Sequence, residues 1–170
     1  MTRSICLLLA ALAAPTAVFA TEHEVAAFGR ILDACYVAAQ DGAHAACIGG
    51  MSRECMDGQE GGHTTLGITS CTLAEARVWD KLLNREYQEI FAGLAAMDKD
   101  EAEFFPEFAK RAESLREAQR AWIVFRDAEC GLAYAMWGSG SMRNIASATC
   151  QRDMTAARTI ELKHLGSNMR

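Results

Sequence analysis

The sequence has little proline and no segment that predicts a β-strand. Only 2 of its 170 residues are proline, and no internal repeat or low-complexity tract occurs. Apolar residues instead recur at the three- and four-residue intervals of amphipathic helices through most of the chain. We therefore predict an all-α fold, a small antiparallel helical bundle tied by disulfides.

The motifs of several enzyme classes are also missing. The chain has no Ser-His-Asp order, no phosphate-binding glycine loop and no C-x-x-C pair. Its histidines, His23, His44, His63 and His164, are scattered rather than grouped as metal ligands. We expect a protein that is not an enzyme, with no catalytic residues, no cofactor and no metal.

The first 20 residues predict a secretory signal that is cleaved after Ala20. Arg3 precedes a short apolar run, and Val18 and Ala20 are small residues of the kind that signal peptidase accepts. The run is short for a membrane span, and no other segment is long and apolar enough to cross a bilayer. We expect a periplasmic or secreted protein without stable membrane insertion.

The chain that remains, residues 21–170, is acidic. The signal carries one base, Arg3, and no acid, so the 17 basic and 22 acidic residues of the whole chain become 16 and 22, a net charge of −6. Seven acids and one base lie from Glu86 to Glu107, whereas five bases and two acids lie from Ser141 to Arg170. An acidic flank can attract a basic partner, although a solvated helix face is the commoner meaning of such a run. The overall sign disfavours nucleic acid as a partner.

An even number of cysteines in an exported chain predicts disulfides. The six that remain after cleavage are Cys35, Cys47, Cys55, Cys71, Cys130 and Cys150. Cys130 and Cys150 stand about two helical turns on either side of "GSGS", 138–141, so an antiparallel hairpin would bring them level. That pair is the firmest. Cys35–Cys47 spans a turn in a similar way, and Cys55–Cys71 remains.

Five helices are predicted from the apolar spacing. They cover residues 22–40, 45–55, 71–97, Pro106 to about Trp137, and 142–165. Thr72 and Glu75 form a capping-box signature at the start of the third helix. The segment 56–70 has four glycines and predicts a long loop, which a Cys55–Cys71 disulfide would close at its base.

The stretch "AQRAWIVFRDAEC", 118–130, places polar side chains on the apolar face of a helix. At about 100° per residue, Gln119 and Arg126 share one stripe with Trp122. A buried guanidinium needs a partner, and the helix after Thr72 supplies candidates, as do Gln151 and Thr155 on the last helix. We interpret the set as a structural polar network, with an acid–base site as the alternative. Its members are Glu75, Asp80, Asn84, Gln119 and Arg126.

The combined pattern resembles the LprI-like lysozyme inhibitor family of exported bacterial domains. The matching residues are Cys71, Glu75, Trp79-Asp80, Leu83-Asn84, Tyr87, Leu115, 118–122, 125–128, Cys130, 138–141, Cys150, Thr155, Arg158 and Leu162. The match covers about 71–165. We expect three parts: a signal peptide at 1–20, a helical and loop extension at 21–70, and an LprI-like domain at 71–165.

The resemblance implies a disulfide-tied helical domain that inhibits lysozyme, a basic enzyme toward which the acidic segment would steer it. It also implies that the motif residues hold the bundle, so contacts would come from loops. Candidate contact residues are His63 and Thr64 in the loop 58–69, and Trp137 and Arg143 in the turn 137–143. The alternative function is a structural or adaptor protein of the cell envelope with another partner.

Overall fold

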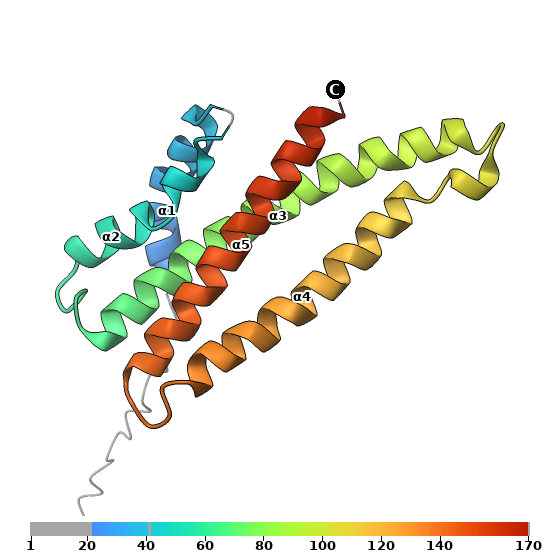
Figure 1. Ribbon diagram of the computed structural model, residues 1–170. Helices are drawn as coiled ribbons and strands as arrows, with labels where there is room; N and C mark the ends of the chain where they lie inside the picture. Colours follow the sequence, from blue (N-terminus) through green and yellow to red (C-terminus); the bar gives the residue numbers. More distant parts are fainter. Residues whose placement is uncertain (1–21, 41, 170) are drawn as a thin grey trace, which may run out of the picture.

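The computed structural model describes residues 22–40 and 42–169, and helices are the only regular secondary structure in that part of the chain (Figure 1). The predicted signal peptide, 1–20, lies outside the described residues. The α-helices are α1 Glu22–Ala38, α2 Gly50–Asp57, α3 Thr65–Glu101, α4 Arg111–Ala135 and α5 Met142–Asn168, and the 3₁₀ turns are η1 His44–Cys47 and η2 Pro106–Phe108. The prediction of an all-α, disulfide-tied fold is confirmed. No helix in the described ranges is long and apolar enough to cross a membrane.

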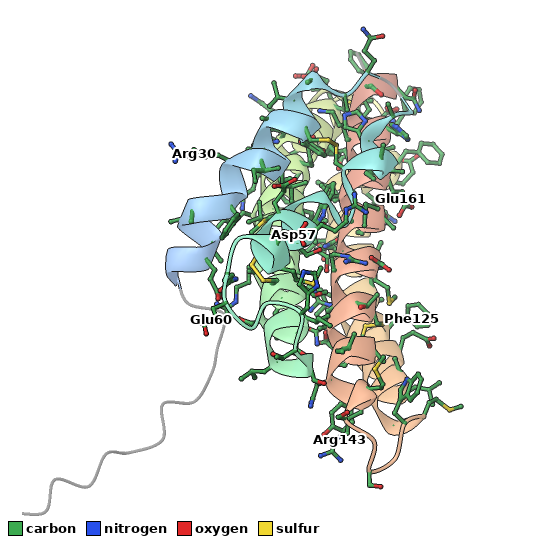
Figure 2. The ribbon with its side chains drawn as sticks, turned by 90° about the vertical axis from the view of Figure 1, so that its left-hand side faces the viewer. Arg30, Asp57, Glu60, Phe125, Arg143 and Glu161 are labelled. Atoms are coloured by element: carbon green, nitrogen blue, oxygen red, sulfur yellow. A yellow bond between two sulfur atoms is a disulfide. The ribbon has the colours of Figure 1, made fainter. Side chains whose placement is uncertain are left out.

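The long helix α3 is the spine of the molecule. Figure 1 shows α5 crossing α3, with α4 on one side of this pair and α1 and α2 on the other. A view turned by 90° places α1 and the loop that carries Glu60 on one side of the bundle and Phe125 of α4 on the opposite side (Figure 2). The connection between α3 and α4 therefore projects away from the N-terminal helices.

Two clusters of buried side chains hold these helices together. In the first, Leu32 and Tyr36 of α1 and Met51 of α2 pack on Trp79 of α3, which is fully buried. The second cluster joins α3, α4 and α5 through Leu83, Ile90, Leu115 and Leu162. The apolar residues of α3 in both clusters recur at intervals of three and four, which puts them on the faces that its neighbours cover.

The helix α3 begins at Thr65, six residues earlier than the start predicted at Cys71. The Thr64 hydroxyl accepts a hydrogen bond from the Gly67 N–H at 3.1 Å and caps the helix. The predicted loop 56–70 is therefore reduced to 58–64. Glycine is required beside this cap, because a Cβ on Gly62 would overlap the backbone of Met56.

Glu75 does not serve as a capping-box residue of its own helix, so that prediction is wrong. Its carboxylate is fully buried in the first third of α3 and accepts hydrogen bonds from the N–H groups of Gly49 at 2.6 Å and Ser52 at 2.8 Å, and from the Trp79 indole at 3.1 Å. Gly49 is the N-cap of α2, and because glycine has no side chain it cannot cap the helix itself. Glu75 thus supplies the anionic cap of a different helix, where the positive end of the helix dipole favours it.

Three disulfides tie the bundle in the pairs that were expected. Cys35–Cys47 links α1 to η1, Cys55–Cys71 links α2 to α3, and Cys130–Cys150 links α4 to α5, with Cα–Cα distances of 5.8, 5.7 and 5.4 Å. The last two lie toward the same end of the bundle, so both connections at that end are covalently closed.

The fourth helix starts at Arg111 rather than at Pro106, which corrects another boundary. Pro106 opens η2, and Lys110 stands between this turn and α4. The segment 102–110 is therefore a connection whose side chains are free to face outward.

We predict that Glu75→Ala lowers the free energy of unfolding by about 3 kcal/mol or more, because two N–H groups of α2 and one indole N–H lose a charged acceptor inside the core. Glu75→Gln keeps the shape and one acceptor oxygen, and should lose less. Urea unfolding with the disulfides intact measures both. The control is Glu89→Ala, which removes an exposed carboxylate from the same helix. Equal stability of the Glu75 and Glu89 variants would contradict the capping role.

Candidate partner-binding surfaces

Arg126 is not paired with the third helix, so the predicted partner is wrong. Its Nε and Nη2 donate to the Asp127 carboxylate at 3.0 and 2.8 Å, and its guanidinium stacks on the Trp122 ring at 5.2 Å. The side chain keeps 20% of its surface exposed, while that of Asp127 keeps 62%. Arg126 therefore lies at the border of the packed face of α4 and is balanced by its own neighbour in sequence.

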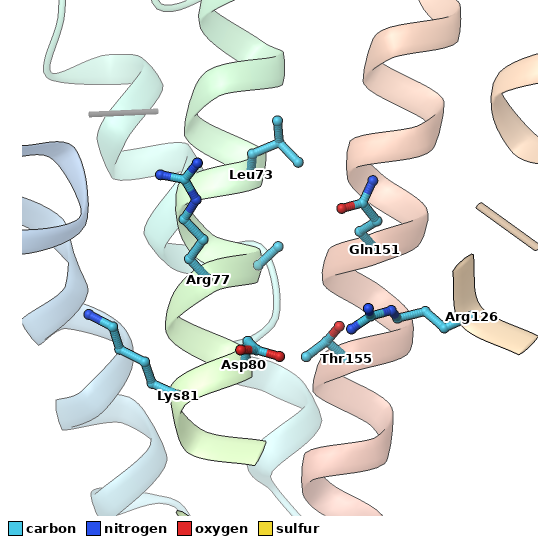
Figure 3. A pocket seen from close by; sticks show the side chains of 8 residues that line it. Leu73, Arg77, Asp80, Lys81, Arg126, Gln151 and Thr155 are labelled. Atoms are coloured by element: carbon cyan, nitrogen blue, oxygen red, sulfur yellow. The ribbon is translucent and has the colours of Figure 1, made fainter. Parts of the chain in front are cut away.

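The side chain of Arg126 lines an open groove between α3, α4 and α5 (Figure 3). The groove has a volume of about 460 Å³. Arg77, Asp80 and Lys81 line it from α3, and Gln151 and Thr155 line it from α5. Asp80 and Arg126 border the same space, but an open groove does not force them into the ion pair that a closed core would require.

The other predicted members of the polar network lie in separate places. Gln119 accepts a hydrogen bond from Arg158 at 3.1 Å, and Arg158 also donates to Glu161 at 2.9 Å. Asn84 donates to Asp80 at 3.2 Å on the exposed side of α3. The structure thus replaces one continuous network by several local pairs, and it gives Gln119 a partner on α5.

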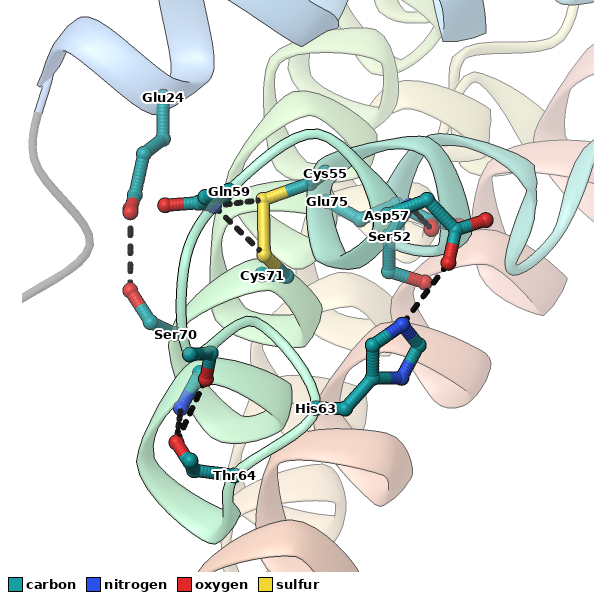
Figure 4. The surroundings of a disulfide bond; sticks show 12 residues. Glu24, Ser52, Cys55, Asp57, Gln59, His63, Thr64, Ser70, Cys71 and Glu75 are labelled. Carbon is teal, nitrogen blue, oxygen red and sulfur yellow. Dashed lines mark hydrogen bonds and ion pairs between the residues drawn. A yellow bond between two sulfur atoms is a disulfide. The ribbon is translucent and has the colours of Figure 1, made fainter.

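The loop 58–64 and the turn between α4 and α5 lie toward the same end of the bundle in Figure 1. Figure 4 shows His63 reaching Asp57, with Nε2 2.9 Å from the carboxylate, and both side chains are exposed. The Thr64 hydroxyl donates to Gly61 O at 2.7 Å and caps α3. His63 is therefore accessible, whereas the hydroxyl of Thr64 is engaged in the turn.

The α4–α5 turn presents an indole and a guanidinium. Trp137 is 50% exposed. Arg143 donates to Gly138 O at 3.3 Å and stacks on the Tyr134 ring at 5.2 Å. Arg143 is the one charged residue in the sequence from Gly131 to Gln151, so this turn is apolar with a positive charge.

The connection between α3 and α4 is held by an ion-paired clamp. Arg111, the first residue of α4, donates to Asp98 at 3.2 Å and to Glu101 at 2.8 Å, both near the end of α3. The second oxygen of Asp98 accepts from the Ala112 N–H at 2.8 Å. Partial desolvation acts to raise the pKa of Asp98, but hydrogen bonds from the backbone of Ala112 and Arg111 and from the Arg111 guanidinium outweigh it, and the pKa lies below its usual value.

The connection that this clamp closes, residues 102–110, has three exposed phenylalanines, which were not among the predicted contact residues. Phe104, Phe105 and Phe108 are 75, 54 and 63% exposed. The sequence feature that could have indicated them is "EFFPEF", 103–108, in which a proline interrupts a run of aromatic and acidic residues. Among the described residues, no group of three or more His, Cys, Asp or Glu side chains is placed to hold a metal ion.

Comparison with known proteins identifies the family of the chain. The family described as Lysozyme inhibitor LprI matches residues 55–162, more than half of the chain. The chain belongs to the LprI family. An uncharacterized protein of Rhizobium meliloti (strain 1021) is 35% identical over 100 residues, which span 59% of this chain and 72% of that protein. No solved structure matches.

The LprI match covers the open groove, the α4–α5 turn and the α3–α4 connection, and it begins at Cys55, so it includes the loop 58–64 as well. The helix α1 and the 3₁₀ turn η1 precede it. All candidate surfaces therefore belong to the part of the chain that the family shares.

We predict that Arg126→Ala lowers the free energy of unfolding by about 1–2 kcal/mol, the sum expected for a partly exposed ion pair and a cation–π contact. Thermal unfolding measures the loss. Asp127→Ala is the control for the ion pair alone and should cost about 1 kcal/mol or less. A loss of about 3–5 kcal/mol for Arg126→Ala would instead indicate a fully buried pair.

We also predict a pH dependence of the clamp. Because the pKa of Asp98 is lowered in the folded state, its contribution to stability is present above the ordinary value of 3.8 and is lost as pH falls through the lowered value. The difference in Tm between the wild-type protein and Asp98→Asn should therefore narrow on acidification. In an Arg111→Ala background the same substitution should produce a smaller difference at neutral pH. A difference that is independent of pH would contradict the clamp.

Proposed function

We propose that this chain is an exported binding protein, not an enzyme, and that it binds a lysozyme and inhibits it. The observation that carries the proposal is membership of the LprI family, whose description names lysozyme inhibition. Disulfides support export, because they persist in oxidising compartments such as the periplasm and the extracellular space. The predicted signal peptide, 1–20, supports the same location.

We also propose that residues 21–70 form an N-terminal extension of an LprI-like domain at 71–165. Packing of α1 and α2 on Trp79 supports an extension that covers one side of the domain. The family match overlaps the extension from Cys55 onward. The Cys55–Cys71 disulfide supports this overlap, since it ties the end of α2 to α3.

A second candidate function is a structural or adaptor protein of the cell envelope. The observation that favours it is exposed apolar surface on α4 and at its end, where Val124 is 71% exposed and the C-cap residue Met136 is 76% exposed. Phe125 and Leu132 belong to the same exposed set, and Figure 2 shows Phe125 projecting from the side of the bundle. Exposed apolar surface of this kind often binds another protein.

We expect the protein to be recovered from outside the cytoplasm with Thr21 at its amino terminus. We also expect it to slow the lysis of bacterial cell walls by at least one member of a panel of animal and bacteriophage lysozymes. Its net charge of −6 after removal of Arg3 should make association with a basic lysozyme fall as salt is raised. Turbidity and surface-binding kinetics measure these effects.

The control is the reduced and alkylated chain, which keeps the acidic residues but loses the three disulfides. Inhibition that is as strong with this control would indicate non-specific binding of charge. If no lysozyme binds the intact protein at low salt, the inhibitor function is rejected and the adaptor function takes its place.

A further inference from the structure

We propose that the chain docks on its target with the α3–α4 connection, a surface that we call the phenylalanine tip and define by Phe104, Phe105 and Phe108. The occupant is a basic protein surface with an apolar depression and a projecting lysine or arginine. The identification of that protein as a lysozyme rests on the proposed function.

The three phenyl rings of the tip are exposed together on one short connection. Each is more than half exposed, and Phe105 and Phe108 lie with their ring centroids 6.4 Å apart. Large aromatic side chains supply much of the energy of protein interfaces when a partner removes them from water. The tip therefore presents anchors of the type that a partner can bury.

The clamp fixes both ends of the connection that carries these rings. Arg111 joins Asp98 and Glu101, and Asp98 also receives the Ala112 N–H, so the ends of α3 and α4 are fixed on both sides of the connection. A surface that is already ordered loses less conformational entropy when it binds. The clamp thus favours a docking role over a flexible linker.

A hollow beside the rings suits a basic side chain. It has a volume of about 390 Å³ and is lined by Met97, Asp100, Glu101, Phe104, Phe105 and Arg111. Arg111 and Glu101, which both line the hollow, form an ion pair with each other. Asp100, which also lines it, is exposed. A lysine or arginine that enters here would meet aromatic faces and a carboxylate, two environments that attract a cation.

Charge separates the phenylalanine tip from the other end of the bundle. Asp100, Glu103 and Glu107 are exposed around the rings, against Lys99 and Lys110, and the tip ends the acidic segment that starts at Glu86. The α4–α5 turn has exposed apolar side chains but carries Arg143. The loop 58–64 carries Glu60 and His63 but no large apolar residue. Of these three surfaces, the tip alone combines aromatic anchors with an excess of acid.

Distance makes the two ends experimentally separable. The 37 residues of α3 separate the loop 58–64 from the tip, which corresponds to about 55 Å along the helix axis. Figure 1 shows the α3–α4 connection at the edge of the molecule, beyond the end of α5. Substitutions at one end should therefore leave the contacts of the other intact.

The test compares binding of the full chain to the lysozyme that responds in the panel, for variants of each surface. Phe104→Ser with Phe108→Ser should raise Kd by about 30-fold or more, as expected when aromatic anchors are removed. Asp100→Asn with Glu103→Gln and Glu107→Gln should lower the association rate at low salt by about tenfold and flatten its salt dependence, with a smaller effect on dissociation.

Two control variants each remove one exposed aromatic side chain from another part of the surface. Phe125→Ser on α4 and Trp137→Ser at the α4–α5 turn should change Kd by about twofold or less. The substituted rings are exposed, so Tm should stay within about 2 °C of the wild type in every variant, as is usual for substitutions on the surface.

The outcomes distinguish this inference from the proposed function. A wild-type chain that inhibits while the double phenylalanine variant binds equally well overturns the tip and leaves the inhibitor function standing. Loss of binding in Trp137→Ser alone assigns the contact to the other end. If light scattering shows a wild-type dimer that the phenylalanine variant abolishes, the tip is an interface between two copies. If no lysozyme binds the wild type, both proposals fall.

Discussion

The buried carboxylate of Glu75 connects the N-terminal helices to the rest of the bundle. Glu75 lies in the first third of α3, and its hydrogen bonds come from the start of α2 and from the indole of Trp79. Because a buried charge must be fully hydrogen-bonded, this one group sets the position of α2 along α3 and the rotamer of the largest core side chain at the same time. Tyr36 and Met51 then complete the cluster around Trp79. The Cys55–Cys71 disulfide closes the same junction covalently.

The helix α4 makes no hydrogen bond with the Glu75 carboxylate, and it has both buried and exposed apolar side chains. Leu115, Gln119 and Cys130 are buried against α3 and α5, while Val124 and Phe125 are exposed on the outer side. Two of its polar side chains have separate partners: Gln119 is paired with Arg158 of α5, and Arg126 with its neighbour Asp127. The exposed side chains of Val124 and Phe125 provide apolar surface of the kind that often binds another protein.

The two ends of the bundle are restrained by different chemistry. At one end, disulfides hold the base of the loop 58–64 and the hairpin of α4 and α5. At the other, the Arg111 clamp joins α3 to α4 through ion pairs and a backbone hydrogen bond. Both devices restrict connections that would otherwise lose entropy on binding. If the chain acts as the proposed inhibitor, contact residues at these ends that are ordered in advance would lose less entropy on binding.

The sequence by itself determined the helical class, the Cys130–Cys150 disulfide and the family. Each of these follows from short-range information: apolar spacing, cysteines placed symmetrically about a turn, and a compound motif. The sequence also indicated that Glu75 and Arg126 were unusual, but it assigned both to the wrong partners. The capping-box pattern of Thr72 and Glu75 is a local signal, and it was outweighed by Thr64, whose hydroxyl caps α3 earlier.

Only the tertiary structure decided which partners the polar side chains have and which side chains are exposed. Whether Arg126 meets Asp80 depends on the separation of α3 and α4 across the open groove, a distance that no periodicity encodes. The setting of Phe108 depends on α4 beginning at Arg111, because a helix that started at Pro106 would have included this exposed residue. Helical spacing specifies which residues share a face, whereas the packing of the neighbouring helices determines whether that face is covered.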